Sequence, residues 1–141
     1  MKISFSWALV VAATLLLAFA PAQAESVVVI VNKDNANVVD KLYITRIYTG
    51  AIRGWPDGLP TFPVDQMEDS AARAAFYDTI VGKSQATMRA IWLQNIFSGN
   101  GLPPKIASPD AAVKLLVVNN RNAIGYILAS QVDSTVRVIA K

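Results

Sequence analysis

The hydrophobic pattern divides the chain into an apolar leader and a longer part in which apolar runs alternate with polar turns. Residues 1–24 have a lysine near their start, Lys2, then an apolar run from Trp7 to Ala20, and small residues at Ala22 and Ala24. This order is typical of a secretory signal peptide. A retained membrane anchor is the alternative, but a spanning helix needs about 18 apolar residues, and this run is shorter. We therefore expect cleavage after Ala24 and one mature domain over 25–141.

Four segments of the mature part predict strands. Residues 26–32 are mostly β-branched without polar alternation, which favours a strand covered on both faces. The stretch 61–65 contains a proline, and the missing N–H favours an edge of the sheet. The tail predicts strands over 123–127 and 135–140, with a short helical piece at 129–131 between them.

Apolar residues at helical spacing predict four helices, each introduced by a capping residue. The alanine-rich second helix is the clearest, because Ala72, Phe76 and Ile80 share one face and Gly82 follows as a terminator. The order of strands and helices predicts an α/β fold with a small mixed sheet flanked by helices. The predicted helices are 41–48 after Asp40, 71–81 after Ser70, 84–97 with Ser84 as cap, and 109–118 after Ser108, with Pro109 as its first residue.

Composition removes whole classes of chemistry. The chain has no histidine and no cysteine, so a Ser-His-Asp triad, a thiolate nucleophile and zinc sites of the Cys/His kind are excluded. The acidic residues are scattered, and only Glu68 and Asp69 are adjacent. We expect no enzyme, no metal and no cofactor; a hydrolase that uses Asp65 or Glu68 is a distant alternative.

Charge also argues against a nucleic-acid partner. The net charge is +3 for the whole chain and +2 without Lys2, and basic and acidic residues are interspersed. A nucleic-acid-binding surface usually shows a basic cluster. No long apolar run recurs after Ala24, so no stable membrane insertion is expected after cleavage.

The start of the second predicted helix is a candidate anion site. A helix N-terminus presents free N–H groups and a partial positive charge. The Ser70 hydroxyl, the N–H groups of Ala71 and Ala72, and the Arg73 guanidinium could therefore converge on one anion. Equally, Ser70 could simply cap the helix while Arg73 lies on a solvated face. Both interpretations stay open.

Five landmarks, in order, resemble phosphate-type periplasmic substrate-binding proteins of ABC importers. Together they cover nearly all of the mature chain. We identify the chain as similar to a single-lobe short form of that family. The landmarks are Ile47-Tyr48-Thr49-Gly50 with Ala51 to Gly58, Pro63-Val64, Asp69 to Phe76, Trp92 with Phe97-Ser98-Gly99, and Ala123-Ile124-Gly125-Tyr126.

The resemblance implies a fold, a ligand class and further site residues. The fold is one lobe of a type 2 periplasmic-binding-protein-like structure, and the ligand is phosphate or a similar small oxyanion. Asp65, at a strand end, joins the candidate site, and so do Gly125 and Tyr126, which could line a cleft at a strand's carboxyl end. Gly125 could instead only permit close strand packing.

The sequence departs from the family pattern at three positions. Ala71 and Ala72 replace the glycine and threonine of the usual Ser-Gly-Thr turn, and Asp65 stands where an arginine or another polar partner is common. An ionised Asp65 would repel a fully ionised phosphate, although a protonated anion such as HPO4(2−) could donate to it. These departures weaken the predicted anion site.

Two tryptophans have a structural and a functional interpretation. Trp55, in a Gly/Pro-rich loop, could stack on a ligand but more often such a residue closes over the core edge. Trp92, at helical spacing, is expected in the core. We favour the structural interpretation for both.

The size of the mature chain sets the functional expectation. Full members of the family close on their ligand with two lobes, and 25–141 corresponds to one. An open lobe should bind a small anion weakly unless a second copy or another protein supplies the other side. The leading hypothesis is an exported oxyanion-binding protein linked to phosphate ABC uptake. The alternative is an envelope interaction module that has lost its ligand and contacts a permease, a sensor or itself.

Overall fold

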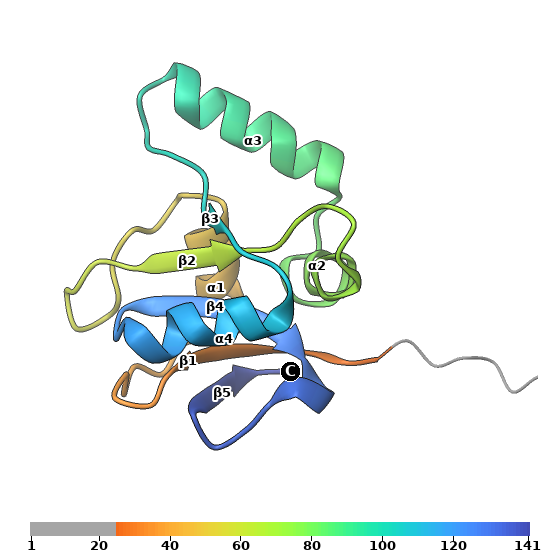
Figure 1. The fold of residues 1–141 in the computed structure, drawn as a ribbon. Helices are drawn as coiled ribbons and strands as arrows, with labels where there is room; N and C mark the ends of the chain where they lie inside the picture. The colour runs from red at the N-terminus through yellow and green to blue at the C-terminus, as the bar shows by residue number, and fades with distance from the viewer. Residues whose placement is uncertain (1–24) are drawn as a thin grey trace, which may run out of the picture.

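The computed structural model describes residues 25–141, and the predicted leader and cleavage site lie outside them. One mixed sheet of five strands has the order β3-β2-β4-β1-β5 (Figure 1). β4 and β5 run antiparallel to β1, whereas β2 runs parallel to β3 and to β4. The strands are β1 (Val27–Asn32), β2 (Phe62–Asp65), β3 (Lys105–Ile106), β4 (Ala123–Leu128) and β5 (Val136–Ala140).

The predicted helices form at the expected places. Side-chain oxygens of Asp40, Ser70 and Ser84 accept the N–H three residues on, so these three caps are confirmed. The last five residues of the second predicted helix form a π-helix, η1, instead of continuing as an α-helix. Gly82 follows as its cap, in the left-handed conformation. The helices are α1 (Lys41–Tyr48), α2 (Ala71–Phe76), η1 (Tyr77–Val81), α3 (Gln85–Phe97), α4 (Asp110–Asn119) and the 3-10 turn η2 (Ala129–Gln131).

The sheet is covered on both faces, as the pattern of 26–32 predicts. Every residue of β1 is buried. Val27, Val29 and Val31 belong to a core shared with α1, α2 and η1, whereas Val28 and Ile30 belong to a second core under α4. A strand with apolar side chains on both sides therefore lies between two helical layers.

The position of β2 corrects one expectation. It is not an edge strand, since the two-residue β3 pairs beside it. The Phe62 N–H donates to Asn122 O on the β4 side, so the nitrogen of Pro63 faces the β3 side. β3 pairs only with Val64 and Asp65, and the missing N–H of Pro63 therefore interrupts no ladder.

The start of α4 corrects a second expectation. Ser108 does not cap this helix; its hydroxyl oxygen accepts the Met67 N–H at 3.0 Å. Pro109 is the cap residue and makes no side-chain bond, so α4 begins at Asp110. Through this hydrogen bond the serine instead connects the loop after β2 to the loop before α4.

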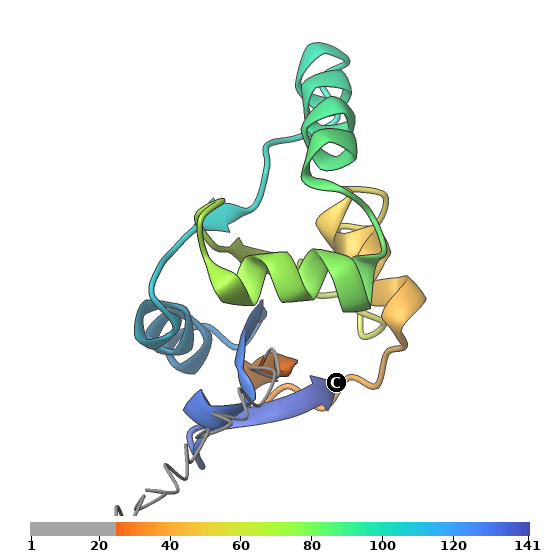
Figure 2. The same ribbon diagram turned by 90° about the vertical axis from the view of Figure 1, so that its right-hand side faces the viewer.

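Helix α3 stands away from the sheet (Figures 1 and 2). Met88 is its only buried residue, and Phe97 is 88% exposed. Trp92 is only partly buried against the first core, where its Nε1–H donates to Tyr48 O at 3.1 Å. Gly50 allows this contact, since a Cβ there would lie 2.8 Å from the Trp92 ring.

Trp55 has the structural role that we favoured. It is 3% exposed, and its Nε1–H donates to Asn122 O at 3.0 Å, which closes the 51–60 loop over the core. Within 25–141, none of the helices combines the length and the apolar character needed to cross a bilayer.

Candidate functional site

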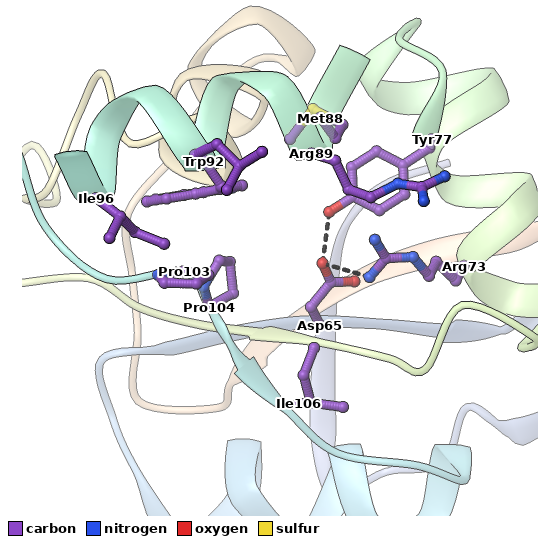
Figure 3. Close-up of a pocket in the computed structure, with 11 residues that line it drawn as sticks. Asp65, Arg73, Tyr77, Met88, Arg89, Trp92, Ile96, Pro103, Pro104 and Ile106 are labelled. Carbon is purple, nitrogen blue, oxygen red and sulfur yellow. Dashed lines mark hydrogen bonds and ion pairs between the residues drawn. The ribbon is translucent and has the colours of Figure 1, made fainter. Parts of the chain in front are cut away.

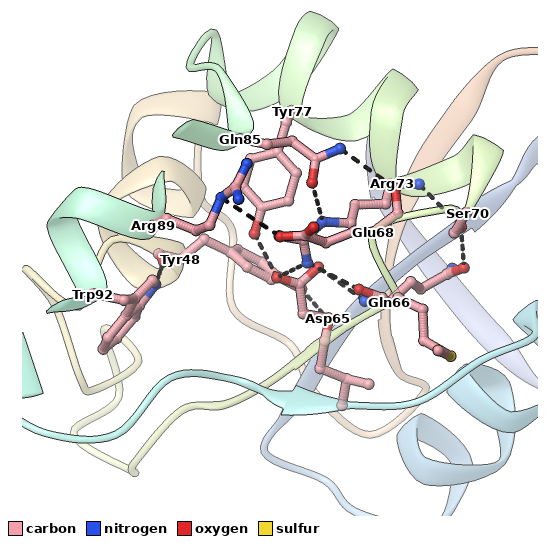
Figure 4. A network of polar contacts seen from close by, with 12 residues as sticks. Tyr48, Asp65, Gln66, Glu68, Ser70, Arg73, Tyr77, Gln85, Arg89 and Trp92 are labelled. Carbon is pink, nitrogen blue, oxygen red and sulfur yellow. Dashed lines mark hydrogen bonds and ion pairs between the residues drawn. The ribbon is translucent and has the colours of Figure 1, made fainter. Parts of the chain in front are cut away.

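The carboxylate of Asp65 is the centre of a buried polar network where β2 ends (Figure 4). Oδ2 accepts the Tyr77 hydroxyl at 2.6 Å and pairs with Arg73 Nη1 at 2.8 Å. Oδ1 accepts the Gln66 N–H at 2.8 Å and the Tyr126 hydroxyl. Four donors from four residues therefore surround one carboxylate.

Three different elements bring these donors together. Arg73 comes from α2, Tyr77 is the first residue of η1, and Tyr126 lies on β4, next to β2 in the sheet. Tyr126 also stacks face to face on Phe76, with ring centroids 4.0 Å apart. The aromatic packing of the core thus holds the hydroxyl groups at the end of β2.

Burial and charge keep the tyrosines protonated. Desolvation, followed by the nearby Asp65 charge, raises the pKa of Tyr77 and Tyr126 far above the usual range. The same two causes, in the same order, raise the pKa of Tyr48. All three hydroxyls are therefore donors, since a second negative charge beside the buried carboxylate is disfavoured.

Arg73 is largely committed to this network. Its side chain is 9% exposed, and besides the ion pair its Nη1 donates to Gln66 O at 2.9 Å. Its Nε donates to Gln85 Oε1 at 3.3 Å. Nη2 makes no hydrogen bond to any residue in 25–141. Asp65 thus receives the donors that an external anion would require.

Ser70 acts as a cap and as a link to the same network. Its hydroxyl oxygen accepts the Arg73 N–H at 3.2 Å, and its O–H donates to Gln66 Oε1 at 2.6 Å. The first helical bond of α2 runs from the Ala74 N–H to Ser70 O. The N–H groups of Ala71 and Ala72 precede that bond and belong to the unpaired first turn.

Two cavities flank the end of β2. An open cavity of about 670 Å³ lies between the starts of α2 and α4 and includes Ser70, Ala71 and Ala72 in its lining. A smaller cavity of about 310 Å³ lies beneath α3 and is lined by Asp65 and Arg73. The predicted site residues are therefore divided between two places.

Gly125 lies apart from both cavities. A Cβ at this position would be 2.6 Å from Val113 Cγ1, so the glycine allows α4 to pack closely on β4. Tyr126 reaches only the Asp65 network. The structure therefore unites Asp65, Arg73 and Tyr126, connects Ser70 to them through Gln66, and leaves Gly125 as a packing residue.

The sequence reasoning missed three polar residues of the site. Gln66 directly follows β2, and its amide donates to Asp110 Oδ1 and to Tyr126 O, each at 2.9 Å. Asp110 accepts the Leu128 N–H with its other oxygen. Tyr77 lies inside the predicted helix 71–81, and helical spacing alone does not show that its hydroxyl faces Asp65. Within 25–141, no cluster of three acidic, histidine or cysteine residues could hold a metal.

Comparison with known proteins gives structural relatives but no sequence family. No protein-family model and no curated protein matches the chain. Among solved structures, the fold matches a protein from Clostridium perfringens assigned as a phosphate ABC transporter substrate-binding protein and solved with bound phosphate. That match has 28% identity and a TM-score of 0.65, and it covers 82% of this chain and 44% of the other.

Two further structures match over the same share of this chain. An ABC-type phosphate transport receptor from Vibrio cholerae has 19% identity and a TM-score of 0.64, with 45% of its chain covered. PstS from Borrelia burgdorferi has 10% identity and a TM-score of 0.61, with 47% covered. The chain thus spans less than half the length of these structures and has the fold of one lobe. The resemblance predicted from the sequence landmarks is confirmed.

Proposed function

We propose that this chain, built like one lobe of a phosphate-type substrate-binding protein, binds phosphate or a similar small oxyanion and does not act as an enzyme. The observation that supports the proposal most is the start of α2. There a capping serine and two unpaired N–H groups border an open cavity, in a fold shared with a phosphate-bound neighbour.

The anion binds at Ser70, Ala71 and Ala72, in the open cavity. Arg73 acts indirectly, because its N–H donates to the Ser70 hydroxyl and its guanidinium already pairs with Asp65. Asp69 and Asp110 also line this cavity, so it suits an anion that can donate a proton. At neutral pH phosphate retains such a proton and sulfate does not. We therefore expect phosphate to bind more tightly than sulfate.

Affinity should be low for one lobe alone. A micromolar site needs about 8 kcal/mol. A helix N-terminus supplies about 0.3–1 kcal/mol, or about 2 when partly buried. Each charge-assisted hydrogen bond adds about 1.5–3 kcal/mol, before desolvation is subtracted. Millimolar affinity is the expected result.

Calorimetric titration of the purified protein with phosphate, sulfate and molybdate tests the proposal. Binding of phosphate should release heat at millimolar concentration. The Ser70→Ala substitution should weaken the affinity for phosphate several-fold. Ser84→Ala, which removes the matching cap of α3, should leave phosphate affinity unchanged. Absence of both heat and thermal stabilisation at millimolar anion would remove the ligand function and leave the fold assignment intact.

Export and transport complete the proposal. Cleavage after Ala24 places the mature domain in the periplasm or outside the cell, where its partner is the permease of a phosphate ABC importer. Mass spectrometry of the exported protein should give Glu25 as the first residue. A retained leader would contradict this part of the proposal.

A second function, self-association, is favoured by the exposed apolar residues around α3. Leu93 is 56% exposed, Phe97 88% and Leu102 82%. A second copy packed on this face would bury them and could supply the second lobe. Light scattering after size exclusion should then show a dimer that Phe97→Ser dissociates; a monomer at all concentrations would rule it out.

A further inference from the structure

The cavity beneath α3 is large enough for a small ligand and is distinct from the open cavity at the start of α2. Its volume is about 310 Å³, at the lower end of the range for small-molecule sites. Figure 3 shows Trp92 and Ile96 on α3 facing Pro103 and Pro104 across it. The apolar lining residues are Met88, Trp92, Leu93, Ile96, Pro103, Pro104 and Ile106.

The polar end of this cavity carries a surplus positive charge. Arg73, Arg89 and Asp65 line it, and the Asp65 carboxylate is already matched by Arg73 at 2.8 Å. The nearest acid to Arg89 is Glu68, with 3.7 Å between Nε and Oε1, and both side chains are more than half exposed. Such an exposed pair contributes little, so the Arg89 charge remains available.

The donors that remain also point to an anion. Asp65 already accepts from four donors, and the Tyr77 hydroxyl is one of them, so neither group is free to select a ligand. Arg73 retains Nη2, without a hydrogen bond within 25–141, and Arg89 retains most of its guanidinium. Two arginines at one end of an apolar hollow can bind one carboxylate or phosphate group in a forked arrangement.

We infer that this cavity binds a small organic anion with a flat apolar body, such as an aromatic carboxylate or an aromatic phosphate ester. The anionic group lies at Arg89 and at Nη2 of Arg73. The apolar body lies between Trp92 and the two prolines. This site is separate from the proposed phosphate site at Ser70, so either can exist without the other.

Four probes separate the parts of this inference. The protein, expressed from its full coding sequence, is titrated with benzoate, phenyl phosphate, benzyl alcohol and inorganic phosphate, and the indole N–H signal of Trp92 is followed by NMR. Benzoate and phenyl phosphate should shift it at lower concentration than benzyl alcohol, which lacks the charge. Inorganic phosphate, which lacks the apolar body, should leave it unmoved. Whichever charged probe binds more tightly identifies the anionic group.

Variants at exposed positions keep the test independent of folding. Arg89→Gln should weaken the charged probes about tenfold, the loss expected for one charge-assisted hydrogen bond, and leave benzyl alcohol unchanged. Glu68→Gln should strengthen them, because it removes the competing carboxylate. Arg46→Gln, on the exposed surface of α1, is the matched control and should have no effect.

Two results would overturn the inference. One is a Trp92 signal that no charged probe shifts up to millimolar concentration. The other is equal weakening by Arg89→Gln and Arg46→Gln, which would mean unspecific charge attraction. Ser70→Ala distinguishes the two proposals, since it should weaken inorganic phosphate and leave benzoate unchanged.

Discussion

The two cavities beside the end of β2 differ in how their polar groups are satisfied. Beneath α3, Asp65 is only 4% exposed, and its carboxylate is surrounded by donors from α2, η1 and β4. Between α2 and α4, Ser70 is only partly buried and Asp69 and Ala71 are exposed, so the start of α2 is open to solvent. A polar group whose partners are all internal contributes mainly to stability, whereas one that faces solvent remains available to a ligand.

The largest effect is expected from Asp65→Ala. Removing one partner of a buried ion pair leaves the other charge without compensation, which costs about 3–5 kcal/mol of unfolding free energy. Urea denaturation measures it. Asp69→Ala, at an exposed position four residues further along the chain, should change the free energy by less than about 0.5 kcal/mol.

Equal effects of these two substitutions would contradict the comparison. If Asp65→Ala does not fold, Asp65→Asn removes the charge but retains an acceptor for the tyrosine hydroxyls. Its loss of stability should lie between those of the alanine variant and the unchanged protein.

Alkaline pH tests the tyrosines of the network. Burial raises the pKa of Tyr48, Tyr77 and Tyr126 in the folded protein, so the unfolded state releases these protons first. The unfolding free energy is therefore fully retained below pH about 10 and falls above it, by about 1.4 kcal/mol per pH unit for each tyrosine.

The measurement is urea denaturation at several pH values between 8 and 11. Tyr126→Phe removes one of the three groups, so its slope above pH about 10 should be shallower by about 1.4 kcal/mol per pH unit. A slope identical to that of the unchanged protein would mean that Tyr126 ionises in the folded state.

Loss of the two helix caps should have unequal effects. Ser70→Ala should lower the unfolding free energy by about 1 kcal/mol, because α2 packs in the first core through Ala72 and Phe76. Ser84→Ala should have a smaller effect, since α3 buries only Met88 and can open locally. Denaturant unfolding measures both; a larger effect at Ser84 would show that α3 is essential to the cooperative unit.

The smallest effect is expected from Glu68→Gln. Glu68 pairs with Arg89 at 3.7 Å on the surface, and its loss should change the unfolding free energy by less than about 0.5 kcal/mol. Thermal denaturation at low and high salt measures it. A larger change, removed by salt, would show that this ion pair stabilises the loop after β2.

Local sequence signals predicted most of the fold. β1 was predicted because a β-branched run with no polar alternation suits a strand between two layers. α1, α2 and α3 were predicted from caps and apolar spacing, both of which act within a few residues. The landmarks, from Ile47 to Tyr126, were sufficient to identify the lobe that the solved structures match.

Other features depend on partners distant in the sequence. β3 has two residues, Lys105 and Ile106, and becomes a strand only because Val64 and Asp65 lie beside it. The hydroxyl of Ser108 leaves the cap position because the Met67 N–H is within reach. Neither contact leaves a signal in the neighbouring residues.

The sequence by itself determined the classes of chemistry that are absent, the longer helices and strands, and the residue types at the start of α2. Only the tertiary structure decided that Arg73 turns to Asp65 instead of the open cavity, and that Tyr77 and Tyr126 join it there. The physical reason is that a buried charge takes whichever donors the packing brings to it, and those donors come from positions up to 61 residues apart in the chain.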